Sequence, residues 1–159
     1  MDMDRALLKQ IIERYEAANF VVNRRMNAMI RELMPDELTV DQFSTLRYLR
    51  SSGKSTSSEL ADIFCVGRSS VTAIINRLFD KKLIERIPDD KDRRVTYLKL
   101  TEEGIQMSDA MEEKIQTLIA KFITHFDEQE ALCFIETFEK LARRMMQGEE
   151  KQDEDRTEV

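Results

Sequence analysis

The sequence predicts a mainly α-helical protein with one small β-hairpin. Apolar side chains recur at helical spacing through most of residues 4–82 and again through residues 101–147. Residues 83–100 instead contain two short apolar-rich runs on either side of a charged loop. Two short helices joined by a tight turn and followed by a hairpin form a winged helix-turn-helix, here flanked by long N- and C-terminal helices.

The first element expected is a long amphipathic helix over residues 4–34, because its apolar residues repeat every three or four positions. Pro35 ends it, since a proline cannot continue a helix. Thr39 and Gln42 then match a capping box, in which each residue's side chain binds the other's backbone N–H. This pair predicts a second helix over residues 40–51.

Two further helices complete the helix-turn-helix. Thr56 and Glu59 repeat the capping-box spacing before a short helix. Gly67 interrupts the chain a few residues later, and apolar spacing then resumes over residues 68–82.

The hairpin and the last helices follow in order. Residues 83–87 and 95–100 are the expected strands, and Pro88 closes the first of them. The helical period returns at Thr101, and an acidic pair at positions 127 and 130 is placed to cap a final helix.

The charge of the chain is unevenly distributed. The formal net charge is −6, yet residues 45–100 carry 12 Lys and Arg against 7 Asp and Glu, which is +5. The remaining residues carry 13 against 24, which is −11. A basic module within an acidic chain favours a polyanion partner such as nucleic acid, although a solvated basic face is the alternative.

The fourth helix has the two faces that insertion into a DNA major groove requires. Val71, Ile75 and Leu78 share one side, and small polar residues lie opposite. Single serines here can instead serve as helix caps. The DNA-binding residues expected on this helix are Arg68, Ser69, Ser70, Thr72, Asn76 and Arg77.

The charged loop of the hairpin is expected to form a wing that contacts DNA. Arg94 suits the narrow minor groove, whose negative potential attracts arginine, and Asp92 is placed to orient it. Lys91 and Arg93 are expected to contact phosphates. A solvated loop without a DNA role is the alternative for this segment.

A series of motifs over residues 38–104 resembles the MarR family of bacterial transcriptional regulators. The motifs are Leu38-Thr39-x-x-Gln42-Phe43-x-x-Leu46, Glu59-Leu60-Ala61, Val66 with Ser70-Val71-Thr72-x-x-Ile75-x-x-Leu78, Leu83-Ile84-x-Arg86, Asp92-x-Arg94 and Leu100-Thr101-x-x-Gly104. The resemblance implies a homodimer that binds palindromic operator DNA, usually represses transcription, and responds to a small aromatic or anionic effector. It also implies that Asp92 and Arg94 act together.

These features predict four segments. Residues 1–37 form an N-terminal dimerisation helix, residues 38–100 the winged helix-turn-helix, and residues 101–147 the C-terminal dimerisation helices. Residues 148–159 contain six acidic and two basic residues and are expected to be a disordered tail.

Other functional classes find little support in the sequence. It contains no nucleophile and base pair, no Gly-rich phosphate loop and no cysteine or histidine spacing typical of a metal site, so we expect no enzyme, cofactor or metal. No membrane span or signal peptide is expected, which favours a cytoplasmic location.

Two alternative functions stay open at this stage. A winged helix can bind another protein instead of an operator. Cys65, at the predicted turn, could act as a redox-sensing thiol, although the family's peroxide sensors carry their cysteine in the first helix and this chain has none there. Cys133 is expected to be a small core residue.

Overall fold

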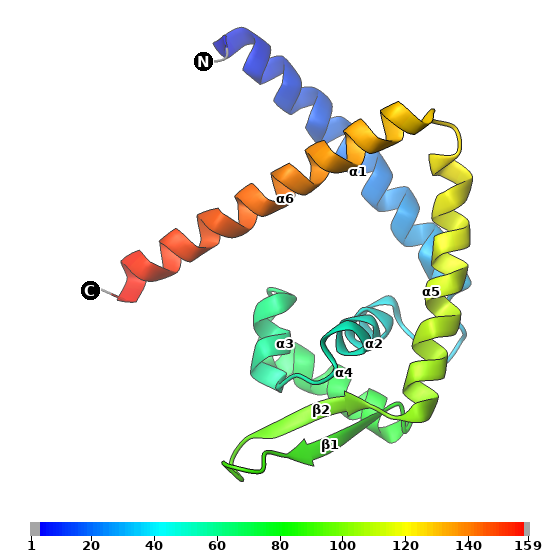
Figure 1. The fold of residues 1–159 in the computed structure, drawn as a ribbon, viewed down its shortest axis with the longest axis vertical. Helices are drawn as coiled ribbons and strands as arrows, with labels where there is room; N and C mark the ends of the chain where they lie inside the picture. Colours follow the sequence, from blue (N-terminus) through cyan, green and yellow to red (C-terminus); the bar gives the residue numbers. More distant parts are fainter. Residues whose placement is uncertain (1–3, 158–159) are drawn as a thin grey trace. The chain divides into compact units, whose positions relative to one another are not determined.

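The computed structural model describes the backbone of residues 4–157 and the side chains of residues 4–147. Figure 1 shows the elements in chain order. They are α1 (Arg5–Leu33), α2 (Val40–Ser52), α3 (Ser57–Ile63), α4 (Arg68–Asp80), β1 (Ile84–Pro88), β2 (Thr96–Leu100), α5 (Glu102–Ile123) and α6 (Glu128–Thr157). The predicted fold class, mainly α with one hairpin, is confirmed.

The chain divides into two units, one up to Ile115 and one from Gln116 onward. The boundary falls within α5, so this helix belongs to both units. The first unit contains α1, the helix-turn-helix and the hairpin. The second contains the end of α5 and all of α6.

All three predicted helix caps are present. The backbone N–H of Gln42 donates to Thr39 Oγ1 at 3.2 Å, and the Thr39 N–H donates to Gln42 Oε1 at 3.4 Å. Thr56 and Glu59 make the same reciprocal pair at 3.2 and 2.8 Å. Asp127 and Glu130 form the third reciprocal pair, at 2.8 and 3.1 Å. Each pair satisfies donors that a helix start otherwise leaves unpaired.

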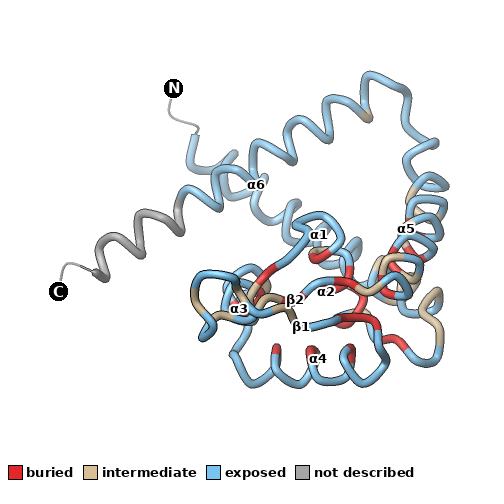
Figure 2. The backbone as a smooth tube through the Cα atoms, turned by 60° about the horizontal axis from the view of Figure 1, so that its bottom comes forward, coloured by how far each residue is buried: buried red, intermediate tan, exposed pale blue. Residues whose placement is uncertain are grey.

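The hydrophobic core of the first unit lies among α2, α3, α4, the hairpin and the first half of α5, as the buried stretches of Figure 2 show. Every helical element there contributes its apolar stripe. The buried apolar residues are Leu38, Phe43, Leu46, Leu49, Leu60, Ala61, Val71, Ile75, Leu78, Leu83, Ile84, Leu98, Leu100, Met111 and Ile115.

The two strands pair antiparallel, with Ile84 opposite Leu100 and Pro88 opposite Thr96. Each strand begins one residue later than predicted. Ser55, in the turn between α2 and α3, adds an isolated bridge to Leu98 through two backbone hydrogen bonds of 3.1 and 2.8 Å. This bridge joins the helix-turn-helix to strand β2 of the hairpin.

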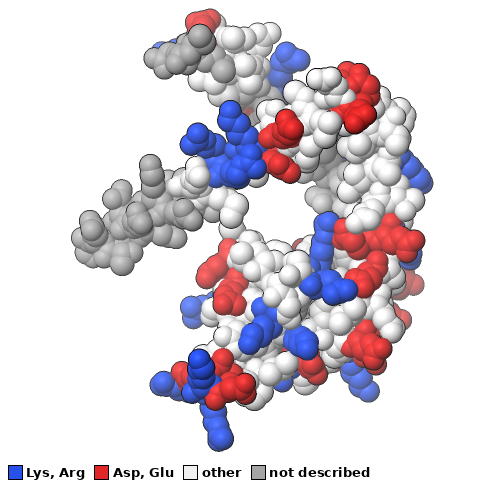
Figure 3. Space-filling view, in the orientation of Figure 1, with Lys and Arg blue, Asp and Glu red and all other residues white. Residues whose placement is uncertain are grey.

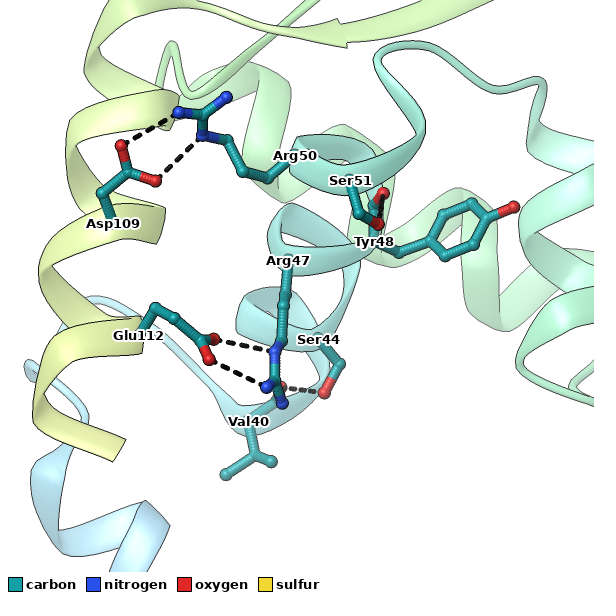
Figure 4. A network of polar contacts seen from close by, with 8 residues as sticks. All are labelled: Val40, Ser44, Arg47, Tyr48, Arg50, Ser51, Asp109 and Glu112. Carbon is teal, nitrogen blue, oxygen red and sulfur yellow. Dashed lines mark hydrogen bonds and ion pairs between the residues drawn. The ribbon is translucent and has the colours of Figure 1, made fainter. Parts of the chain in front are cut away.

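Two ion pairs join α2 to the first half of α5 (Figure 4). Arg47 Nε lies 2.8 Å from Glu112 Oε2, and Arg50 Nε lies 2.9 Å from Asp109 Oδ1. The hydrogen bond and positive charge of Arg50 hold the pKa of Asp109 below its ordinary value. These contacts fix the start of α5 against the helix-turn-helix.

Over residues 148–157, where the composition led us to expect a disordered tail, α6 continues as a helix to Thr157. Residues 158 and 159 lie outside the described residues. Residues 149–152, Glu-Glu-Lys-Gln, are all good helix formers, and one glycine costs a helix only about 1 kcal/mol. Local helix propensity therefore outweighs the acidic composition that suggested disorder.

Candidate nucleic-acid interface

Helix α4 separates a buried face from a small polar face. Val71, Ile75 and Leu78 are buried against the core. The six residues predicted to bind DNA on this helix, Arg68, Ser69, Ser70, Thr72, Asn76 and Arg77, are all exposed. The bulky apolar side chains between residues 68 and 77 are buried or half-buried, and none is exposed among these six, so the helix can approach another surface closely.

The start of α4 is free of side-chain caps. Gly67 is the N-cap residue, and no side chain accepts a hydrogen bond there. Ser69 and Ser70 therefore do not cap the helix, and their hydroxyls are exposed beside its positive end, which attracts phosphate. The Thr72 hydroxyl donates to the Arg68 carbonyl at 2.8 Å, which leaves its oxygen available as an acceptor.

The hairpin tip is a turn organised by two carboxylates. Asp89 Oδ1 accepts the backbone N–H groups of Lys91 and Asp92 at 2.8 and 2.9 Å. These two bonds, that of Asp92 first, and the positive charge of Lys54 hold the pKa of Asp89 below its ordinary value. Backbone bonds between Asp89 and Val95 and between Asp92 and Val95, each 2.9 Å, close the turn.

Asp92 and Arg94, paired by the sequence prediction, are in contact. Asp92 Oδ1 accepts from the Arg94 backbone N–H at 3.0 Å and from its Nε at 3.2 Å, and Oδ2 accepts from Nη2 at 3.4 Å. The Arg94 side chain is nevertheless 90% exposed. Lys91 and Arg93 are exposed at the same tip, where Figure 3 shows basic and acidic side chains intermixed.

The sequence prediction did not include one arginine that the fold brings to α4. Arg86, on β1, donates from Nη2 to Asn76 Oδ1 at 3.0 Å. Its guanidinium also lies over the Phe79 ring, 4.7 Å from the ring centre. Arg86 stood in the family-like motif Leu83-Ile84-x-Arg86, but no local pattern pointed to its partners on the preceding helix.

A hollow of about 340 Å³ lies between α4 and the hairpin. Thr72 and Asn76 line it from the helix, and Arg86 and Thr96 line it from the strands. Two of the side chains expected to contact DNA on α4, Thr72 and Asn76, therefore face the strands of the hairpin across this hollow, which the tip residues 91–94 do not line.

Cys65 lies in the turn between α3 and α4 and is exposed. Its φ angle is 52°, in the left-handed region that non-glycine residues rarely adopt. The thiol lies 3.6 Å from the Asp62 carbonyl oxygen. Cys133 is also exposed within the described chain, so its prediction as a core residue is wrong; the described part of α6 buries no residue.

Two other kinds of site are absent from the described residues. They contain no group of three or more His, Cys, Asp and Glu side chains placed to hold a metal ion. None of their helices is both long enough and apolar enough to span a bilayer.

Known proteins match this chain over most of its length. The uncharacterized HTH-type transcriptional regulator YpoP of Bacillus subtilis is 30% identical over 123 residues, which cover 77% of this chain and 87% of YpoP. The HTH-type transcriptional repressor MdtR of the same organism is 32% identical over 116 residues, which cover 72% of this chain and 74% of MdtR.

A solved structure shares the fold. It is that of a MarR mutant from E. coli in complex with operator DNA, with a TM-score of 0.69 and 24% identity over 82% of this chain and 94% of that one. The family model described as "MarR family" matches residues 38–96, which include the helix-turn-helix, β1 and the hairpin loop. With this match and relatives at 30% identity or above, the chain belongs to the MarR family of transcriptional regulators.

Proposed function

We propose that this chain binds palindromic operator DNA in a sequence-specific manner, as a homodimer, and represses transcription. One observation carries the proposal: a helix with an exposed, small polar face stands next to a hairpin whose tip presents an oriented arginine. A helix of this kind fits the major groove, and an arginine suits the minor groove beside it. The operator complex of a MarR relative supports the same use of the fold.

Each predicted side chain has a role in this proposal. Asn76, Thr72 and Ser69 read base edges or nearby phosphates from α4, with Arg68, Ser70 and Arg77 on phosphates around them. Arg94 enters the minor groove, and Asp92 holds its guanidinium. Lys91 and Arg93 neutralise phosphates, which contributes affinity without sequence preference.

The dimer is proposed because the apolar faces of two helices, α1 and α6, are left uncovered in a single chain. Helix α1 has no buried residue, and it exposes Leu7, Leu8, Ile11, Ile12, Tyr15, Phe20, Val21 and Val22. Helix α6 exposes Leu132, Phe134, Ile135, Phe138, Leu141, Met145 and Met146. Apolar surface of this extent is typical of a subunit interface. Residues 1–37 and 101–147 are therefore our proposed dimerisation segments, with residues 38–100 as the DNA-binding segment.

Release by a small aromatic or anionic effector completes the proposal, and family membership supports it. A hollow of about 530 Å³ at the junction of α1 and α2 has the size of a small-ligand pocket. Arg31 lines it, but so do Asp36 and Asp41. Because two carboxylates oppose one guanidinium there, this hollow suits a neutral aromatic compound better than an anion.

The experiment is a selection of bound sequences from a randomised 40-base-pair duplex library by the full chain. We expect an inverted repeat to be enriched, with half-sites about one DNA turn apart. Ser69→Ala and Thr72→Ala should each change the enriched half-site, whereas Lys91→Ala should weaken binding to all sequences alike. Equal retention of all sequences would contradict operator recognition and favour a protein partner.

A further inference from the structure

The side-chain amide of Asn76 contacts Arg86, and this contact limits which groups of a DNA base the amide can bind. Its Oδ1 accepts a hydrogen bond from Arg86 Nη2 at 3.0 Å. A guanidinium has only donors, so the amide oxygen must face it and the amide nitrogen must point away. The orientation of this side chain therefore follows from the chemistry of its partner.

Arg86 is itself held from two sides. Its backbone is fixed in the hairpin, where it pairs with Leu98, a buried residue. Its guanidinium lies over the ring of Phe79, one turn of α4 beyond Asn76. The hairpin thus holds a hydrogen-bond donor, the Arg86 guanidinium, next to the exposed face of α4.

This arrangement changes the base that Asn76 suits. A free asparagine pairs with adenine in the major groove by accepting from N6 and donating to N7. Here the oxygen already accepts from a cation, and that positive charge repels a second donor such as the adenine amino group. The nitrogen still offers two N–H donors, and guanine presents two adjacent acceptors, N7 and O6.

We propose that Arg86 is a positioning residue that turns Asn76 into a donor toward DNA, so that Asn76 favours guanine over adenine at the base pair it faces. This inference rests on the proposed operator binding. It gives the hairpin a second role besides the proposed contacts of its tip with DNA. The hairpin would also determine which base Asn76 on α4 prefers.

The test uses sequence selection from a randomised duplex library with the full chain and its variants. Asn76→Ala identifies the base pair concerned, because preference should be lost there alone. The parent protein should prefer guanine over adenine at that position by about tenfold. Arg86→Met keeps an apolar stem over Phe79 but has no donor, so it should shift the preference toward adenine. Arg86→Lys restores a donor and should retain guanine.

Lys99→Ala is the matched control, because it removes one exposed positive charge from the same hairpin at a position that pairs with Glu85 and not with Arg86. It should lower affinity for all sequences without altering the preferred base. Guanine preference that persists in Arg86→Met, or a selected site unchanged in Asn76→Ala, would overturn the inference while leaving operator binding intact. Absence of any enriched sequence with the parent protein would overturn both.

Discussion

At the scale of single residues, Asp92 shows how a carboxylate can serve a surface proposed to bind a polyanion. Its two oxygens contact the backbone and the side chain of Arg94, which stays almost fully exposed. An arginine whose guanidinium is already held by a carboxylate loses less conformational freedom when it enters a groove.

The first prediction concerns this pair. Arg94→Ala should cost about 1 to 3 kcal/mol of operator binding. Asp92→Ala should also weaken binding, although it removes a negative charge, because Arg94 is then unoriented. Both variants should be measured on one DNA fragment across a salt series. Simple electrostatics gives the opposite sign for Asp92→Ala, so tighter binding by that variant would show that the wing acts only as a charged loop.

The second prediction concerns pH and Asp89. The backbone N–H groups of Asp92 and Lys91 hold its pKa in the folded chain below the ordinary value of about 3.9. A carboxyl with a lowered pKa stabilises the turn above its unfolded-state pKa, and this stability is lost as pH falls through the folded value. The amide NMR signals of Lys91 and Asp92 should therefore shift only below about pH 4.

Asp89→Asn provides the control for that titration. Its amide oxygen can still accept both N–H groups, so the turn should persist while the pH dependence at Lys91 disappears. A midpoint above the ordinary aspartate value would contradict the hydrogen bonding described for this turn.

The third prediction is that Cys65 is a turn residue and not a required sensor. Its thiol is exposed, but its polar contact is a backbone carbonyl, that of Asp62. Cys65→Ser should bind DNA as the parent does, and any peroxide-induced release should be the same in both proteins. Mobility shifts with and without peroxide compare them. Loss of a release that the parent shows would establish Cys65 as the redox switch.

At the scale of elements, the joint between the hairpin and α5 explains the spacing Thr101-x-x-Gly104. The Thr101 N–H donates to the Leu83 carbonyl at 3.1 Å, and its hydroxyl accepts the Gly104 N–H at 3.1 Å. Gly104 is buried, and a Cβ atom there would collide with the Leu83 carbonyl oxygen. Helix α5 can approach the hairpin this closely only because Gly104 has no side chain.

The fourth prediction follows from this contact. Gly104→Ala should destabilise the protein by about 1 to 3 kcal/mol, because the backbone must move apart to admit the methyl group. Helix propensity alone gives the opposite sign, a gain of about 1 kcal/mol. Thermal unfolding measures the balance. Ala110→Gly, at an exposed position of the same helix, reports the propensity effect alone. A higher Tm for Gly104→Ala would mean that the two backbones are not in close contact.

At the scale of the whole molecule, the uneven distribution of charge along the chain bears on how it would bind DNA. Residues 45–100 carry a net charge of +5, and the remaining residues carry −11. A chain with net charge −6 can therefore bind DNA through one region while the remainder repels it. Such repulsion favours a single binding orientation.

The fifth prediction is that the protein is a stable dimer at micromolar concentration, with its two α4 helices about 34 Å apart on DNA. Ile12→Glu and Ile135→Glu each place a charge within an exposed apolar face and should shift the protein toward monomer. Sedimentation velocity distinguishes the two states. Glu13→Lys, a charge change outside the apolar residues of α1, is the control and should stay dimeric. A monomeric parent would exclude the proposed assembly.

The sequence alone determined the features that depend on residues close together in the chain. The three capping boxes, the two faces of α4 and the positions of both strands were predictable, because a helix or strand repeats its environment every few residues. The motifs that place the chain in its family are of the same local kind. The tail was the exception, since its composition suggested disorder where its helix-forming residues continue α6.

Only the tertiary structure decided which side chains meet across elements. Arg86 reaches Asn76 across 10 residues of chain, and Arg47 reaches Glu112 across 65. Such pairs depend on how the hairpin and α5 pack against the helix-turn-helix, and periodicity within one element carries no record of that packing. The oxygen of Asn76 is directed toward the hairpin for this reason: the partner that orients it belongs to another element, brought there by burial of the shared core.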